Sequence, residues 1–65
     1  MIKKLKVGDK IQEIGKTYVN GTIIGYDGEV YKILWDHGGY GHSGLAFISK
    51  HFKVILPAAR VIRII

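Results

Sequence analysis

Residues 37–44 are the segment with the clearest potential for chemistry, because four glycines are interspersed there with His37, Tyr40, His42 and Ser43. Glycine lets a backbone approach a phosphate or a base closely and take positive φ angles without strain. The segment is not a Walker phosphate-binding loop, because it lacks the Gly-Lys-Ser/Thr motif. We therefore interpret residues 37–44 as a loop in which Tyr40 and His42 are candidate contacts to nucleic acid.

Three histidines and Asp36 are the side chains to weigh for metal binding or catalysis. The spacing of His37, His42 and His51 matches no recognised metal site, and the chain has no cysteine for a thiolate ligand or a nucleophile. A triad of Ser43, His42 and Asp36 would lack the surrounding shell that fixes such geometry. We therefore expect no metal, no cofactor and no enzymatic activity.

The net charge favours an anionic partner. Ten Lys and Arg against five Asp and Glu give a formal charge of +5. The excess lies at the two ends, in residues 1–16 and 37–65, whereas residues 17–36 carry one lysine against three acidic residues. If the ends meet, they would form one patch that attracts nucleic acid or acidic proteins, although such lysines can also serve only to solvate a protein. The candidate phosphate contacts are Lys3, Lys4, Lys6, Lys50, Lys53, Arg60 and Arg63.

Tyr18, Tyr26 and Tyr40 fall in or beside predicted loops, where a core role is less natural. Gathered at one rim, three such rings could form a stacking platform for bases or a cage for a cation, and the net charge of +5 disfavours the cation. The alternative is that they shield the ends of a barrel. No segment resembles a base-reading helix, so we expect any binding to be weakly sequence-specific.

The composition predicts that strands position these side chains. Valine, isoleucine and threonine total 18 residues, and nine glycines accompany a single proline. In the segment 29–36, Tyr31, Ile33 and Trp35 share one face at a period of two, and we expect Trp35 in the core. Asn20-Gly21 and Asp27-Gly28 are turn signals. The predicted strands are 10–14, 22–26, 29–36, 45–48 and 52–56, with a turn of 3₁₀ helix at 49–51.

Five short strands in this arrangement predict one all-β domain over residues 1–65, a five-stranded SH3-like barrel with its core in residues 5–56. Residues 58–65 form an apolar tail or a sixth strand. Burying one large apolar side chain is worth roughly 1.5–3 kcal/mol, so we expect the tail to pair with its own barrel or to bury against a second copy as a homodimer. An open meander with a C-terminal helix is the alternative fold.

The motifs in residues 7–11, 20–25 and 31–38 resemble the Tudor-like and KOW-like branch of the SH3-like barrels. They resemble its Gly-Asp before the first strand, its Gly-x-Ile/Val in the second and, with Ile33 at the valine position, its Tyr-x-Val-x-Trp-x-x-Gly in the third. The resemblance covers roughly residues 5–56 and implies binding of nucleic acid, methylated side chains or protein partners. A fainter likeness to type II dihydrofolate reductases covers residues 7–56. Leu45-Ala46-Phe47-Ile48 replaces the Val-Gln-Ile-Tyr that carries their chemistry, which argues against an enzyme.

The sequence thus predicts a small basic module that binds DNA or RNA without sequence specificity. The alternative is a protein–protein interaction module, such as a phage or mobile-element accessory protein that acts on a host protein. No apolar run reaches the 18 residues of a membrane span, and the N-terminus leads to no signal-peptide apolar stretch. Together with the absence of cysteine, this predicts a cytoplasmic protein.

Overall fold

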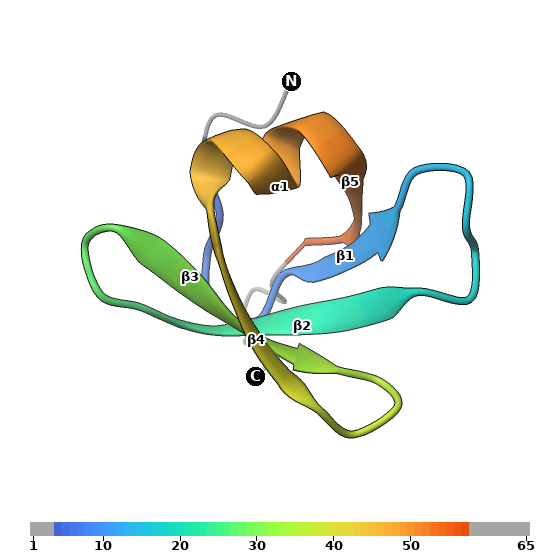
Figure 1. Cartoon of the computed structure of the whole chain (residues 1–65), viewed down its shortest axis with the longest axis horizontal. Helices are drawn as coiled ribbons and strands as arrows, with labels where there is room; N and C mark the ends of the chain where they lie inside the picture. The colour runs from blue at the N-terminus through green and yellow to red at the C-terminus, as the bar shows by residue number, and fades with distance from the viewer. Residues whose placement is uncertain (1–3, 58–65) are drawn as a thin grey trace, which may run out of the picture.

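Five antiparallel strands form a single sheet in the computed structural model, which describes residues 4–57 (Figure 1). Lys3, Arg60, Arg63 and the predicted tail at 58–65 lie outside the described residues. The elements are β1 (Lys10–Glu13), β2 (Asn20–Tyr26), β3 (Val30–Trp35), β4 (Tyr40–Gly44), α1 (Leu45–His51) and β5 (Phe52–Leu56).

The strand order is β4-β3-β2-β1-β5. The first four strands form a meander, and α1 then carries the chain to β5, which pairs with β1 (Figure 1). Within residues 4–57, β4 and β5 are the two edges and do not pair with each other, so the sheet is open. The prediction of a mainly β domain with five strands is confirmed, whereas closure of the sheet into a barrel is not.

The core lies on the inner face of the curled sheet. Ile11, Ile23 and Ile33 come from adjacent strands and are fully buried, and Ile48 of α1 is buried against them. Leu5, which precedes β1, joins this cluster. The short helix and the segment before β1 therefore cover the apolar face that the sheet alone would leave exposed.

Trp35 explains why the glycine-rich segment is a strand rather than the predicted loop. A Cβ atom at Gly41 would lie 2.7 Å from the indole Nε1 of Trp35, and one at Gly21 would lie 2.8 Å from its Cε3. Glycines on both neighbouring strands therefore leave room for the indole, which packs on the core. Gly38, with φ of 107°, makes the preceding tight turn, in which the Gly38 N–H donates to the carbonyl of Trp35 at 2.9 Å.

Two other predictions are wrong, each for its own reason. Asn20-Gly21 is not a turn but the start of β2, because Gly21 is needed beneath the indole of Trp35 and the Cγ2 of Ile33. The predicted strand 45–48 and the predicted turn at 49–51 are one helix, α1. An apolar run as short as this does not distinguish a strand from a buried helix by its pattern alone.

The predicted turn at Asp27-Gly28 is confirmed. Gly28 has a φ of 102°, which glycine adopts without strain. The Oδ1 atom of Asp27 accepts the backbone N–H groups of Glu29 and Val30, both at 2.9 Å. This turn fixes the end of the β2–β3 hairpin, next to the candidate site described below.

Candidate functional site

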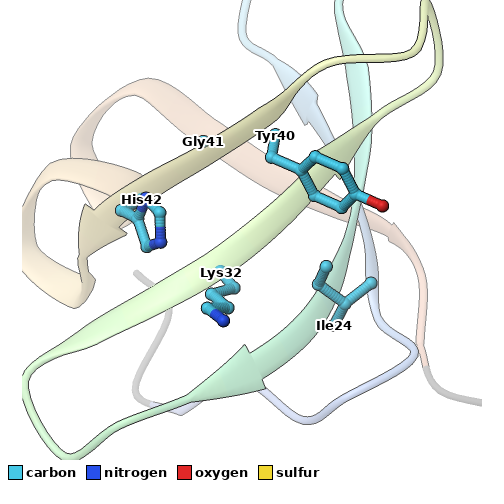
Figure 2. Close-up of a pocket in the computed structure, with 5 residues that line it drawn as sticks. All are labelled: Ile24, Lys32, Tyr40, Gly41 and His42. Atoms are coloured by element: carbon cyan, nitrogen blue, oxygen red, sulfur yellow. The ribbon is translucent and has the colours of Figure 1, made fainter.

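A shallow depression of about 280 Å³ lies on the outer face of the sheet and is lined from three neighbouring strands (Figure 2). Ile24 comes from β2, Lys32 from β3, and Tyr40, Gly41 and His42 from β4. A second depression of about 290 Å³ shares Ile24 and Lys32 with the first. The two adjoin, and we call them together the outer groove; its second part is lined by Ile24, Gly25, Tyr26, Asp27 and Lys32.

The strand register places these side chains on one face. Lys32 is directly opposite His42, and Leu34 is directly opposite Tyr40. Successive residues of a strand point to opposite faces, so Tyr40 and His42 share the outer face. Figure 2 shows both side chains on the same side of the sheet as Lys32.

A β-bulge in β2 supplies the floor of the outer groove. Ile23 is opposite Ile33 and Gly25 is opposite Lys32, so Ile24 is an extra residue of β2 at this point. Ile23 is fully buried, whereas 37% of Ile24 is exposed. The stem of Lys32 lies over Gly25, where a Cβ atom would be 3.6 Å from the Lys32 Cδ.

The outer groove is cationic in its centre and anionic at the β2–β3 turn. Within residues 4–57 no ion pair is formed by Lys32, whereas Lys10 lies 3.4 Å from Asp36. The backbone N–H of Val30, then that of Glu29, donates to Asp27 and lowers the pKa of its carboxyl group, with a smaller contribution from the nearby His42. Asp27 is therefore ionised at neutral pH and opposes an anionic ligand at that end.

Of the three tyrosines considered for one rim, the structure sets Tyr18 apart, whereas Tyr26 and Tyr40 line adjoining parts of the outer groove. Tyr18 lies in the β1–β2 loop and Tyr26 lies at the other end of β2, about 20 Å along the strand. The Tyr26 ring stacks on Tyr31 at 4.3 Å, and its hydroxyl donates to the carbonyl of Gly28 at 2.9 Å. Tyr40, which is 73% exposed, is the one that lines a depression beside a lysine and a histidine.

The predicted basic residues do not form one patch in the described part of the chain. Lys4 and Lys6 precede β1, whereas Lys50 lies beside its far end, because the Ile14 N–H donates to the carbonyl of His51. Lys53 lies between them on β5, opposite Gln12. These four lysines are therefore distributed along β1 instead of gathered at one point.

The remaining candidate chemistry is also separated by the fold. No group of three or more potential metal ligands occurs among residues 4–57. Ser43 and His42 are adjacent on β4 and so point to opposite faces, and Asp36 pairs with Lys10. The triad considered from the sequence is therefore not assembled.

Lys32 and Ile24 are groove residues that the sequence analysis did not select. The alternation of residues 31–35 already places Lys32 on the face opposite Trp35. The sequence did not predict the strand at 40–44, and this strand is what brings Tyr40 and His42 beside Lys32.

In residues 4–57 no helix is long and apolar enough to cross a membrane. Comparisons of this chain with protein-family models, curated proteins and solved structures found no match.

Proposed function

We propose that the protein is a small basic module that binds nucleic acid, DNA or RNA, without sequence specificity, and that it does so at the outer groove. One observation carries the proposal: the exposed ring of Tyr40 lines the same depression as Lys32 and His42. Aromatic rings that stack on bases and cations that neutralise phosphates are the features that proteins combine for this kind of binding.

The overall charge supports the same proposal. A formal charge of +5 on 65 residues raises the local concentration of a polyanion around the molecule. Lys4, Lys6, Lys50 and Lys53 then act as peripheral phosphate contacts along β1 and β5, in addition to the central Lys32. Such contacts hold a strand in place without reading its bases.

We further propose that the open sheet is related to the SH3-like barrels of Tudor-like and KOW-like type. A four-stranded meander is followed by a short helix and by a fifth strand that returns to β1. The Gly8-Asp9 motif has a structural role in this arrangement: Gly8 has a φ of 104°, and Asp9 accepts the backbone N–H of Lys6 at 2.8 Å.

A fluorescence anisotropy titration with labelled single-stranded and duplex oligonucleotides tests the function. Non-specific affinities reach roughly 10⁻⁴–10⁻⁶ M at physiological salt, so we expect binding tighter than about 100 μM at low salt, and weaker binding would overturn the proposal. Replacing Lys32 with alanine should reduce the log–log salt slope on single strands by about 0.7, the share of one phosphate. The matched control is Lys16→Ala, because Lys16 lies outside the outer groove and pairs with Glu13 at 3.5 Å.

A second candidate function, binding of a protein partner, is favoured by a different surface. Ile14 and Phe47 are 55% and 53% exposed, and the Phe47 ring lies 4.5 Å from the ring of His51. The Ile14 N–H donates to the carbonyl of His51, so Ile14 and Phe47 each lie beside His51. Exposed apolar groups that cluster in this way are typical of protein-binding sites.

A pull-down from nuclease-treated lysate separates the two functions. A partner that is retained by the Tyr40→Ala variant and lost by the Phe47→Ala variant would support the protein-binding function. A partner released by the nuclease treatment would support nucleic acid as the ligand.

A further inference from the structure

We infer that the outer groove binds one unpaired nucleobase of a single strand, stacked on the ring of Tyr40, with a neighbouring phosphate held by Lys32 and His42. This inference rests on the proposed function and narrows its ligand from any nucleic acid to a single-stranded one.

The Tyr40 ring is available for stacking. It is 73% exposed, and within residues 4–57 it has no aromatic partner and its hydroxyl has no hydrogen-bond partner. Tyr26, in contrast, already stacks on Tyr31. Figure 2 shows the Tyr40 ring extending from β4 over the sheet, on the side where Ile24 and Lys32 also project.

The size and chemistry of the depression suit one planar base. Its volume of about 280 Å³ lies just below the roughly 300–1,000 Å³ of pockets that take drug-sized ligands. Ile24 gives it an apolar floor, and the backbone of Gly41 lines it between Tyr40 and His42. None of the five lining residues is acidic.

Lys32 and His42 are placed to hold the phosphate next to that base. They form a directly opposed pair on β3 and β4, so their Cβ atoms are about 5 Å apart. The acidic group near this pair is Asp27 at the β2–β3 turn, which interacts electrostatically with His42 and lines the second part of the groove with Lys32. The bound nucleic-acid strand therefore leaves the groove away from that turn, where the Asp27 carboxylate would repel its phosphates.

Base pairing excludes a duplex from this arrangement. Each base of a duplex is already stacked on both faces, and a ring that lies on the surface of a sheet reaches a base face only after costly unstacking. The bases of a single strand are free to turn toward the ring, as they do on the stacking platforms of single-strand binding proteins. We therefore expect a preference for single strands that phosphate contacts alone would not produce.

The experiment compares three probes of equal length at one salt concentration: an oligothymidine strand, an abasic strand with the same phosphates, and a duplex. Anisotropy should show that the wild-type protein binds oligothymidine roughly 5- to 150-fold more tightly than the abasic strand, the usual contribution of one stacked base. The Tyr40→Ala variant should lose this difference, and Tyr40→Phe should keep it because the ring remains. The matched control is Tyr18→Ala, since Tyr18 is 78% exposed and lies outside the groove.

The outcomes distinguish this inference from the function on which it rests. Equal binding of the oligothymidine and abasic strands by the wild-type protein would overturn the stacked base and leave phosphate binding in place. Tighter binding of the duplex than of the oligothymidine strand would also overturn the stacked base and leave phosphate binding in place. Failure to bind any of the three probes would overturn the proposed function as well.

Discussion

Replacing Gly21 with alanine should destabilise the fold, although alanine normally stabilises a strand relative to glycine. The new Cβ atom would lie 2.6 Å from the Cγ2 of Ile33 and 2.8 Å from the Cε3 of Trp35. Ile33 is fully buried, and a close-packed core resists the shift that the new atom would require. Overpacking of this kind costs about 1–3 kcal/mol, and the glycine-to-alanine exchange returns about 0.5–1 kcal/mol of it, so the net loss is up to about 2.5 kcal/mol.

The matched control lies four residues along the same strand. At Gly25 the nearest atom to an added Cβ is the Cδ of Lys32 at 3.6 Å, which is an ordinary contact with a flexible side chain. The Gly25→Ala variant should therefore be as stable as the wild type or slightly more stable. Neither glycine has a positive φ, so backbone strain does not confuse the comparison.

Thermal unfolding followed by the fluorescence of Trp35, the single tryptophan, measures both variants. One kcal/mol shifts the midpoint of a domain of this size by about 4–8 °C, so Gly21→Ala should melt several degrees below Gly25→Ala. Equal midpoints for the two variants, or a higher one for Gly21→Ala, would refute the reasoning that Trp35 and Ile33 require a glycine at this position.

Three further predictions follow from the turn, the ion pair and the groove. The Asp27→Ala variant should lose part of the acid dependence of stability. A carboxyl group whose pKa is lowered by folding stabilises the fold above its unfolded pKa, and this contribution is lost as the pH falls through the folded pKa. Acid titrations of the unfolding free energy of both proteins would measure the difference. Lys10→Met should change the free energy of unfolding in urea by less than about 1 kcal/mol, because its pair with Asp36 is solvent-exposed; a larger loss would contradict this assignment. Glu29→Gln should tighten the binding of single strands in low-salt anisotropy, an effect that vanishes at high salt, because it removes an exposed negative charge at the β2–β3 turn; unchanged affinity at low salt would count against binding at this face.

Local patterns were sufficient for those parts of the fold that depend on neighbours in the sequence. The alternation of Tyr31, Ile33 and Trp35 identified β3, and Asp27-Gly28 identified the turn before it. The strand β4 was not predictable in this way, because Gly41 is explained by its contact with Trp35 on the adjacent strand rather than by anything within residues 37–44. That contact depends on the β3–β4 register, which the residue types alone do not give.

The candidate site was predicted in part for the same reason. Tyr40 and His42 were selected from their unusual glycine-rich surroundings, whereas Lys32 was not, because its position beside them depends on the β3–β4 register. The expectation that the basic ends would meet rested on proximity of the termini. In the described residues, Lys6 and Lys50 instead lie near opposite ends of β1, whose four residues span about 13 Å.

Because of the bulge in β2, the floor of the outer groove can be changed without a change in the core. Ile24 is not paired with a residue of β3. A variant from which Ile24 is deleted would therefore keep Ile23 and Tyr26 opposite their present partners, Ile33 and Tyr31. An insertion or deletion elsewhere in the strand would turn every later side chain to the wrong face. Deletion of Ile24 would therefore remove the floor of the outer groove while retaining an intact interior.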